Sequence, residues 1–506
     1  MSGKTLIRGV NWVGDAVMTM PAVRAIKRAA PDSLSSLLVK PWVAPLFEKD
    51  PFVDRTIIYE DSHSGIMGKF QLARALREER FDRAILLQNA LDAAVTAWLA
   101  RIPERIGYAR DGRGLLLTHA LPHSGEDRSM HHIDYYLKLL ESVGLPPSGT
   151  DTWIYLDLAE RLAAREKISS LKRPILGINP GASYGSAKQW LPERFTEVAR
   201  RIIEELDGSV LVFGGPGEAD VASEIISPIQ EHANTGRAVN MAGKTGLREL
   251  MSLMSECDVV LSNDSGPMHI ADGLAVPLVA IFGSTSPELT GPRKPSSHVV
   301  RAGVDCSPCF RRTCPDKGLA CMETIGVEEV FSAVRQALPS GRAVLLDRDG
   351  TICQDADYLN SWDKLNVFND ISSLNMLLNI DFNLIGITNQ SGISRGIVED
   401  GFVNDVNRMF IEEYGFSGFY YCPHHPDDMC TCRKPEPGLA IRARDEHDID
   451  LRRSYMVGDK DADMLLGRAI GARTILVTTG KQKSSPYADF RASDLKEAVE
   501  HIISQK

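Results

Sequence analysis

The stretch AVLLDRDGT, residues 343–351, decides the fold of the C-terminal third of the chain. An apolar run typical of a buried strand ends directly in Asp347, and Asp349 follows two positions later. The two carboxylates therefore leave one sheet edge close enough to repel each other, and a divalent cation offsets that repulsion. One carboxylate can then attack phosphorus as a nucleophile while the other protonates the leaving oxygen. Two solvated aspartates at a strand end are the alternative interpretation.

Three later segments carry groups that suit the same chemistry. The strand-like run FNLIGI leads into residues 388–391, whose side chains can donate to phosphate oxygens. The basic pair Arg433 and Lys434 comes next, and the run SYMVG is followed by Asp459 and two further aspartates. Because parallel strands meet at one edge of a sheet, these groups are expected to lie close to Asp347.

This order of strand–Asp, strand–Thr, Lys and strand–Asp resembles the haloacid dehalogenase (HAD) superfamily of phosphatases over nearly all of residues 342–480. The resemblance implies that Asp347 is the nucleophile and Asp349 the general acid/base. The magnesium ligands that it implies are Asp347, Asp349 and Asp459. The substrate contacts that it implies are Asp355, Tyr358, Thr388, Asn389, Gln390, Ser391, Arg433, Lys434 and Lys460.

The segment CPHHPDDMCTC offers four soft ligands at Cys422, His424, Cys430 and Cys432. The spacing C-x-H-x5-C-x-C can close a tetrahedral site, and thiolate with imidazole ligation suits zinc. Reduced surface cysteines are the alternative, and His425 is a competing ligand that is expected to face solvent. The segment resembles the HAD branch of heptose bisphosphate phosphatases and histidinol-phosphate phosphatases, in which the zinc is structural. The short span between His424 and Cys430 leaves both substrates open.

The N-terminal segment LIRGVNWVGDAVMTMPAVRAIK places a strand before Asp15 and a helix after it. Apolar residues every three positions from Val17 to Ile26 predict a buried helix face, which Pro21 is expected to kink. A carboxylate at this point argues against anion binding by the helix, so Asp15 is either an N-cap or a base.

Three strand ends farther along the chain carry residues that can bind a nucleoside diphosphate. They lie in ILGINPGASYGSAKQW with Lys188, in SVLVFGGPGEAD with Glu218, and in DVVLSNDSGPMH with Asp264. Backbone N–H groups and Lys188 can cradle a diphosphate, and Glu218 can accept from ribose hydroxyls.

Two α/β halves with these segments resemble the ADP-heptose:lipopolysaccharide heptosyltransferases over residues 1 to about 338. These are two-lobed GT-B glycosyltransferases built from two Rossmann-like domains. The opening NWVGDAVMTMPAVRAIK and the block CSPCFRRTCP look like the branch that adds the second inner-core heptose. The resemblance implies that Asp15 deprotonates the acceptor hydroxyl in an inverting transfer without a metal. The donor contacts that it implies are Ser183, Lys188, Glu218, Asp264, Gly266 and His269.

Composition and predicted linkers limit the fold class, the domain organisation and the location of the whole protein. Alternating strand-like and helix-like runs predict α/β units with parallel sheets, at residues 1–165, 166–339 and 340–506. The net charge of −10 argues against nucleic acid as a default partner. No apolar run approaches about 18 residues and no signal-peptide core is present, which predicts a cytoplasmic protein, at most peripheral to a membrane.

Two motifs have no assigned role. Cys306, Cys309, Cys314 and Cys321 form either a metal or redox site or reduced loop thiols. An ordinary surface role is predicted for the pair His131–His132, at the start of a helix.

Together the resemblances predict a bifunctional enzyme of lipopolysaccharide inner-core biosynthesis. The first half would transfer heptose from ADP-L-glycero-D-manno-heptose to heptosyl-Kdo-lipid A at the inner face of the inner membrane. The last domain would remove the 7-phosphate of D-glycero-D-manno-heptose 1,7-bisphosphate with Mg²⁺, and a zinc would hold its loop. The fusion favours heptose bisphosphate over histidinol phosphate. A phosphatase for histidinol phosphate or another small monoester, and a first half that binds nucleotide sugar without transfer, are the alternatives.

Overall fold

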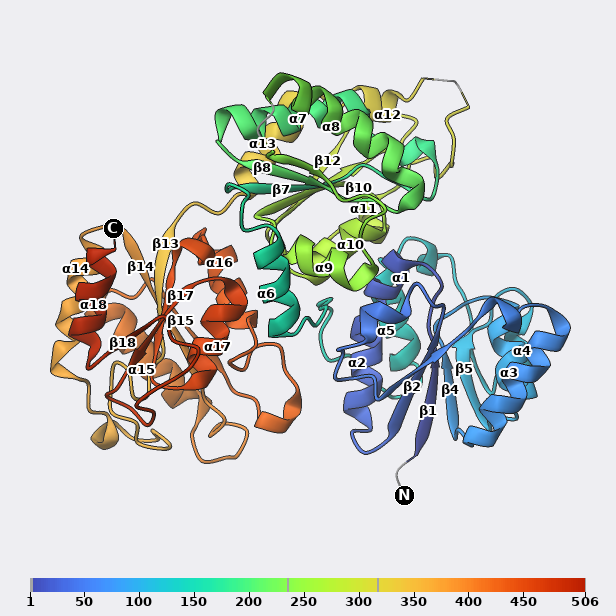
Figure 1. Cartoon of the computed structure of the whole chain (residues 1–506). Coiled ribbons are helices and arrows are strands. Elements are labelled where there is room, and N and C mark those ends of the chain that lie inside the picture. The colour runs from blue at the N-terminus through green and yellow to red at the C-terminus, as the bar shows by residue number, and fades with distance from the viewer. Residues whose placement is uncertain (1–2, 234–235, 316–317, 506) are drawn as a thin grey trace. The chain divides into compact units, whose positions relative to one another are not determined.

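The computed structural model describes residues 3–233, 236–315 and 318–505, and the chain divides into two compact units, residues 1–338 and 339–506. Two six-stranded sheets lie in the first unit and one in the second. Figure 1 draws the strands as arrows with helices packed around them. Neighbouring strands run parallel throughout. These sheets confirm the predicted α/β class. The domain boundary near residue 165 stays a prediction, because both sheets of the first unit belong to one compact body.

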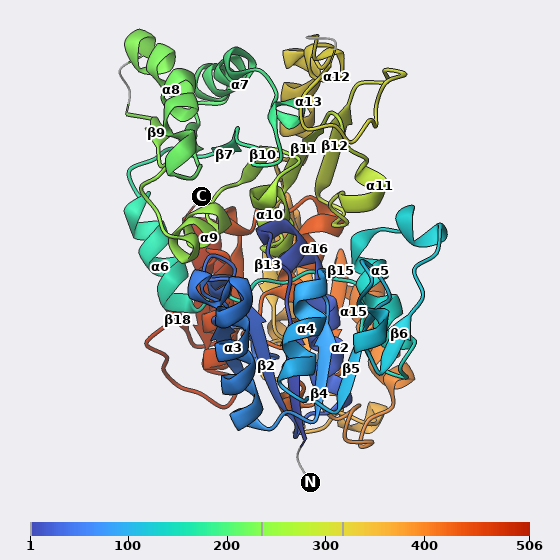
Figure 2. The same cartoon turned by 90° about the vertical axis from the view of Figure 1, so that its right-hand side faces the viewer.

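The first sheet has the order β3-β2-β1-β4-β5-β6, and helices cover both of its faces (Figure 2). Leu6 packs with α3 and α4 on one face, and the next residue, Ile7, packs with α2 and α5 on the other, as the alternation along a strand requires. The elements are β1 (Lys4–Arg8), α1 (Val13–Met18), α2 (Met20–Ala29), β2 (Leu34–Val39), β3 (Arg55–Ile58), α3 (Gly65–Glu79), β4 (Arg83–Leu86), α4 (Leu91–Leu99), β5 (Glu104–Tyr108), β6 (His119–Leu121), α5 (His132–Glu141) and α6 (Leu158–Lys167).

The predicted kink at Pro21 is confirmed as a break between two helices. Helix α1 ends at Met18 and α2 begins at Met20, so Pro21 falls in the first turn of α2. A proline is tolerated there because the first N–H groups of a helix have no partner within the helix. The predicted apolar face from Val17 to Ile26 is buried.

The second sheet has the order β12-β11-β10-β7-β8-β9, so strands are added on one side of β7 up to β9 and on its other side from β10 onward. Ligands bind where the strand order switches in this way, outside the carboxyl ends of the strands. The elements are β7 (Ile175–Asn179), α7 (Pro192–Glu205), β8 (Ser209–Val212), α8 (Ala219–Ala233), β9 (Ala238–Asn240), α9 (Leu247–Ser255), β10 (Val259–Asn263), α10 (Gly266–Gly273), β11 (Leu278–Phe282), α11 (Pro287–Thr290), β12 (Ser297–Arg301), α12 (Ala320–Glu323) and α13 (Val327–Ala337).

One apolar core joins the two sheets of the first unit. Side chains of α2 and α5 from the first half and of α9 and α10 from the second belong to the same buried cluster. Helix α1 also packs against α10. This packing fixes the ends of β1 and β10 relative to each other.

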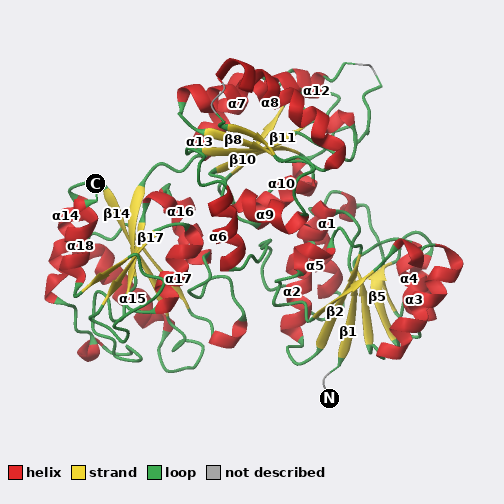
Figure 3. Cartoon of the chain, in the orientation of Figure 1, coloured by secondary structure: helices red, strands yellow, loops and turns green. Residues whose placement is uncertain are grey.

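The second unit is built on the order β15-β14-β13-β16-β17-β18, with β13 near its centre. In Figure 3 the strands of this unit are yellow and lie among red helices. Helices α15 and α18 share a core with Val344 and Leu346 on one face, and α16 and α17 share one with Ala343 and Leu345 on the other. The elements are β13 (Arg342–Leu346), α14 (Asn375–Leu378), β14 (Phe382–Asn389), α15 (Asp400–Tyr414), β15 (Gly418–Cys422), α16 (Gly438–His447), β16 (Tyr455–Gly458), α17 (Asp461–Ile470), β17 (Arg473–Val477), β18 (Phe490–Ala492) and α18 (Leu495–Ser504).

Among the residues that the structure describes, no helix is both long enough and apolar enough to cross a bilayer.

Candidate active sites

A cavity of about 1000 Å³ lies in the first unit, at the carboxyl ends of β1, β7 and β10. The structure brings all the residues predicted for the transferase into its wall. They are Asp15, Ser183, Lys188, Glu218, Asp264, Gly266 and His269.

Asp15 lies in the first turn of α1, with about a third of its side chain exposed. The N-cap of α1 is Trp12, so the interpretation of Asp15 as an N-cap is wrong. The helix begins three residues earlier than that interpretation requires, and a carboxylate in a first turn is still favoured by the helix dipole. The preceding Gly14 allows α1 to approach the second sheet, because a Cβ there would lie 2.6 Å from a ring carbon of His269.

Charged groups line the cavity on the side of the second sheet. Lys188 Nζ lies 2.5 Å from Asp264 Oδ2, and Thr285 donates a hydrogen bond to the same oxygen. Burial lowers the pKa of His269, so its ring is neutral near pH 7. This part of the wall thus offers the Lys188 ammonium in contact with the Asp264 carboxylate, and the neutral imidazole of His269.

Glu218 lies against the backbone of two loops. Its Oε2 accepts the N–H of Gly215 at 2.7 Å. A Cβ on Gly181 would lie only 1.5 Å from Glu218 Oε1, so the carboxylate lies directly against the loop after β7. The carboxylate is therefore held between the loops after β7 and β8, in the cavity wall.

Several cavity residues were not predicted from the sequence. Trp42 follows β2, and Tyr184, Phe310 and Arg312 come from two loops that meet at the cavity. Tyr184 donates to the carbonyl of Phe310 at 2.7 Å, and the Arg312 guanidinium lies 5.3 Å from the Tyr184 ring. Aromatic residues in loops give only a weak signal in sequence, because their contacts join segments more than 120 residues apart.

The cysteine block of the second sheet forms no gathered metal group in the described part of the chain. Cys306, Cys309, Cys314 and Cys321 are free thiols. Burial, followed by the charges of the other three thiols, raises the pKa of Cys321. Both sequence interpretations of this block stay predictions.

The surface role predicted for the histidine pair is wrong for His131, which is 8% exposed. Its Nδ1 accepts the N–H of Ile133 at 3.2 Å, so Nε2 carries the proton and donates to the carbonyl of Gly291 at 3.0 Å. Burial lowers the pKa of His131 to about 4. The next residue, His132, lies in the cavity wall.

His131 is expected to make the stability of the first unit depend on pH between about 6.5 and 4. Its pKa is lowered in the folded state, so on acidification the unfolded chain binds the proton first and folding loses free energy. His131→Gln retains an amide donor without a titrating group and should flatten this dependence. Urea unfolding at pH 7, 6 and 5, followed by tryptophan fluorescence, measures it, because five of the six tryptophans lie in the first unit.

The exposed His119 provides the matched control for this pH dependence, as His119→Gln. It should follow the wild-type curve. An equal loss of stability on acidification in His131→Gln and in the wild type would contradict the expectation.

Three buried carboxylates gather at the carboxyl edge of the third sheet. Oxygens of Asp347, Asp459 and Asp463 lie within 4.8 Å of one another. Asp347 and Asp459 follow the adjacent strands β13 and β16, and Asp463 lies in the first turn of α17. Burial, followed by the charge of Asp347, raises the pKa of Asp459 to about 7. Asp459 Oδ1 is buried and accepts no hydrogen bond from the described residues, which suits a hard cation such as Mg²⁺.

Lys434 is buried against these carboxylates. Its Nζ lies 2.7 Å from Asp347 Oδ1 and 2.6 Å from Asp463 Oδ1, and it donates to the carbonyl of Ile387. Burial lowers the pKa of Lys434, but the charges of Asp347 and Asp463 outweigh it, so the net shift is upward. The ammonium therefore stays charged beside Asp347. Asn389 accepts the backbone N–H of Lys434 at 3.0 Å and holds its loop.

The Asp349 carboxylate lies outside the group of three. Arg348 Nη2 donates to it at 3.0 Å and Gln390 Nε2 at 2.8 Å, with Thr388 Oγ1 at 3.4 Å. Two of the predicted phosphate donors thus hold Asp349. The predicted magnesium set of Asp347, Asp349 and Asp459 stays a prediction, and Asp463 is a further candidate ligand.

The loop after Asp349 requires a glycine. Gly350 has φ +95°, and a Cβ there would lie 2.6 Å from Asp459 Oδ2. Thr479 donates to the Gly350 carbonyl at 2.7 Å. The backbone can therefore pass close to the carboxylates.

A second polar group lies next to these carboxylates. Lys460 Nζ lies 3.2 Å from Asp355 Oδ2, and Lys481 lies 3.1 Å from the same oxygen and 2.6 Å from Asp357 Oδ1. Lys481 was not predicted, although its place after β17 in TTGKQK gave a signal. Tyr358 packs against Gly392, which directly follows Ser391.

The predicted zinc ligands form a compact cluster. The sulfurs of Cys422, Cys430 and Cys432 lie 3.3–3.5 Å apart, and His424 Nδ1 lies 3.2 Å from Cys432 Sγ and 3.5 Å from Cys422 Sγ. Sulfur ligands about 2.3 Å from a tetrahedral zinc are about 3.7 Å apart, so these four atoms fit a metal ion after a small expansion. Hydrogen bonds from the two neighbouring thiols lower the pKa of Cys430. His425 lies outside the cluster and accepts the N–H of Asp427.

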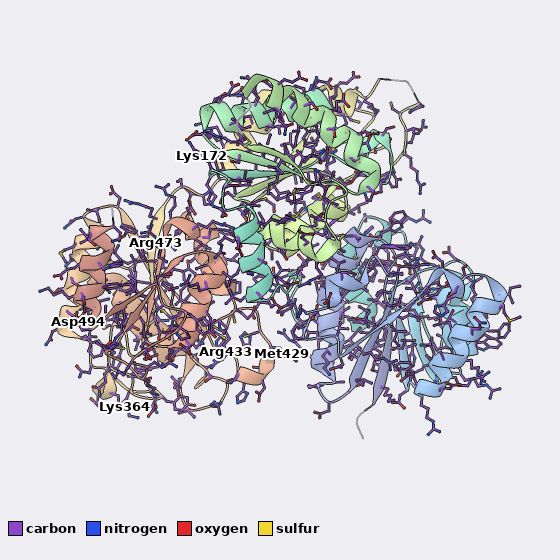
Figure 4. The ribbon with its side chains drawn as sticks, viewed as in Figure 1. Lys172, Lys364, Met429, Arg433, Arg473 and Asp494 are labelled. Atoms are coloured by element: carbon purple, nitrogen blue, oxygen red, sulfur yellow. The ribbon has the colours of Figure 1, made fainter. Side chains whose placement is uncertain are left out.

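The cluster closes the loop that carries Met429 and Arg433, both labelled in Figure 4. Arg433 Nη1 is buried without a hydrogen-bond partner among the described residues. The loop continues directly into Lys434, so the cluster fixes the approach of that ammonium to Asp347.

Comparison with known proteins identifies relatives of both units. Residues 69–320 match the model of glycosyltransferase family 9 (heptosyltransferase), and residues 431–502 match that of the HAD-hydrolase-like family. Lipopolysaccharide heptosyltransferase 2 of Salmonella typhimurium is 30% identical over 308 residues, which cover 59% of this chain and 88% of the relative. D-glycero-beta-D-manno-heptose-1,7-bisphosphate 7-phosphatase of Helicobacter pylori is 34% identical over 172 residues, 33% of this chain and 99% of the relative.

A solved structure matches the first unit. ADP-heptose lps heptosyltransferase II of E. coli is 26% identical with a TM-score of 0.57, covering 66% of this chain and 98% of that chain. The chain therefore belongs to the family 9 heptosyltransferases over its first unit and to the HAD phosphatases over its second, and it joins two enzymes in one polypeptide.

Proposed function

We propose that the first unit transfers heptose from ADP-L-glycero-D-manno-heptose to heptosyl-Kdo-lipid A. Asp15 takes the proton of the acceptor hydroxyl, and the resulting oxygen attacks the anomeric carbon as the bond to ADP breaks, with inversion. Lys188 and the N-terminus of α10 stabilise the negative charge on the leaving diphosphate. Glu218 accepts from the ribose hydroxyls. This proposal is supported by the convergence of the donor residues and Asp15 on one cavity.

We place this reaction at the inner face of the inner membrane. The acceptor is a lipid and is therefore anchored in a bilayer, while ADP-heptose is a charged nucleotide sugar. The protein would then bind the membrane surface peripherally.

The second unit is proposed to hydrolyse the 7-phosphate of D-glycero-D-manno-heptose 1,7-bisphosphate. Asp347 attacks phosphorus and becomes phosphorylated, while Asp349 protonates the leaving sugar oxygen and then deprotonates the water that frees phosphate. Lys434 balances the charge of the phosphoryl oxygens. A magnesium ion held by Asp347, Asp459 and Asp463 would supply further positive charge to those oxygens.

One observation carries the phosphatase proposal: the buried Asp347–Lys434 pair lies among carboxylates at the ends of two adjacent strands. Phosphate release from both anomers of heptose 1,7-bisphosphate and from histidinol phosphate tests it. We expect kcat/KM for one heptose anomer to exceed that for histidinol phosphate by at least about 10-fold, which is about 1.4 kcal/mol. Preference for histidinol phosphate would contradict the proposed substrate while leaving the phosphatase chemistry intact.

Freshly purified protein is expected to contain one zinc ion per chain, bound at the Cys422–His424–Cys430–Cys432 cluster. Structural zinc contributes on the order of 10 kcal/mol to the fold of small domains. Cys430→Ser should therefore lose the zinc and lower phosphate release at least about 10-fold, because the loop before Lys434 loosens. Elemental analysis together with phosphate assays measures both effects.

The control for the zinc prediction is Cys314→Ser, which changes a thiol of the first unit. It should keep one zinc ion and full phosphate release. Protein that contains no zinc when purified, or a Cys430→Ser variant that keeps its zinc, would contradict the assignment.

A further inference from the structure

His132 lies beside Asp15 in the wall of the transferase cavity. Its Nδ1 is 3.5 Å from Asp15 Oδ1, and this nitrogen is buried without a hydrogen-bond partner among the described residues. Leaving a buried polar atom unpaired costs free energy, so such an atom in a native structure calls for an explanation. The remainder of the ring is open to the cavity, since the side chain is 41% exposed.

The helix start that carries His132 is held firmly in place. His131 donates to the carbonyl of Gly291, and Asp134 accepts from Arg293 Nη1 at 2.9 Å. Both contacts tie α5 to the loop after α11, on the side of the second sheet. The ring of His132 is therefore presented to Asp15 from a fixed position.

Other titratable groups also face Asp15. His269 approaches from α10 and Tyr136 from α5, and both are buried and feel the charge of Asp15. Lys188 is paired with Asp264 across the cavity. Within the described residues, His132 is the one basic group within 4.0 Å of the Asp15 carboxylate.

We infer that His132 is a positioning residue for Asp15: its Nδ1–H donates to Oδ1, and Oδ2 is left for the acceptor hydroxyl. A contraction of a few tenths of an ångström brings the pair to hydrogen-bonding distance, as catalytic contacts do when substrate binds. In the transfer step the acceptor proton passes to Asp15 Oδ2, while His132 keeps its own Nδ1 proton. The inference rests on the proposed role of Asp15 as the base.

The contrast between two amide variants tests this role. His132→Asn places an amide nitrogen near the position of Nδ1, and His132→Gln places it near that of Nε2. We expect kcat for transfer to stay within about 3-fold of wild type in His132→Asn and to fall about 10- to 100-fold in His132→Gln and His132→Ala, less than loss of the base itself. The KM for ADP-heptose should stay within about 2-fold in all three variants.

The pH profile of kcat/KM gives a second readout. A hydrogen bond donated to a carboxylate favours its charged form, so losing that bond should move the acid limb to higher pH in His132→Ala and not in His132→Asn. His119→Ala is the matched control, because His119 lies 3.8 Å from Glu104 on an exposed strand outside the cavity. Calorimetric binding of ADP-heptose by the same preparations reports whether the first unit, which carries His132, is folded.

Equal activity of the Asn and Gln variants, or an unchanged acid limb in His132→Ala, would overturn the inference. A raised KM for ADP-heptose with unchanged kcat would instead make His132 a donor contact and overturn it as well. Asp15→Ala is assayed in parallel to separate the role of Asp15 as the base from the positioning role of His132. Full transfer by Asp15→Ala refutes the proposed base, whereas loss of transfer in Asp15→Ala with full transfer in His132→Gln refutes only the positioning role.

Discussion

Asp347→Asn is expected to lower phosphate release by at least about a thousandfold, because an amide cannot form the phosphorylated intermediate. Heptosyl transfer by the same chain should stay within about 2-fold of wild type, because the substitution lies in the other compact unit. Asn has nearly the volume of Asp, and Lys434 keeps its ion pair with Asp463, so the second unit should remain folded. Phosphate release and product formation from ADP-heptose are measured on one preparation.

The control for this variant is Asp405→Asn, an exposed aspartate of α15 in the same unit. It should leave both reactions unchanged. Equal loss of both reactions in Asp347→Asn would contradict separate active sites, and phosphate release near the wild-type rate would refute Asp347 as the nucleophile.

Asp15→Ala is expected to lower heptosyl transfer about 10²- to 10⁴-fold, the range that a general base contributes. Binding of ADP-heptose should stay within about 3-fold of wild type, because the donor contacts come from the second sheet. Phosphate release should not change. Calorimetric binding of ADP-heptose and the transfer rate measure the two effects separately.

The exposed Asp32, in the turn after α2, provides the control as Asp32→Ala. This variant should transfer heptose at the wild-type rate. Loss of donor binding in Asp15→Ala would assign Asp15 to the donor site, and unchanged transfer would refute it as the base.

The carboxylate site of the phosphatase was largely predictable from sequence, because it follows from strand ends. Asp347 and Asp459 each follow a short apolar run, and adjacent parallel strands bring such residues together. Asp463 was one of three aspartates after SYMVG that the sequence offered for a magnesium site, but the resemblance did not imply it as a ligand. Its spacing of four residues from Asp459 was the available signal.

The transferase cavity was predictable where a strand end carries its own motif, as at Lys188, Glu218 and Asp264. His132 was missed because its partner Asp15 is 117 residues away and meets it only through the packing of α5 against α1. The misassigned N-cap at Asp15 has a local cause. Asp is a favoured cap, but α1 starts at Val13 and leaves Asp15 within its first turn.

The cluster of Cys422, His424, Cys430 and Cys432 could be predicted from its residue types and spacing, because the four side chains lie within eleven residues. The block from Cys306 to Cys321 has similar composition, yet its thiols are not gathered in the same way. Spacing alone therefore does not decide whether cysteines converge, since the turn between them must fold the chain back on itself.

Two independent active sites in one polypeptide are tested most directly by mixing purified Asp15→Ala and Asp347→Asn chains and supplying the substrates of both reactions. Each variant alone should perform one reaction, and an equimolar mixture should perform both at about half the wild-type rate per total chain. A mixture that lacks either reaction, or a single variant that has lost both, would contradict the assignment of one activity to each unit.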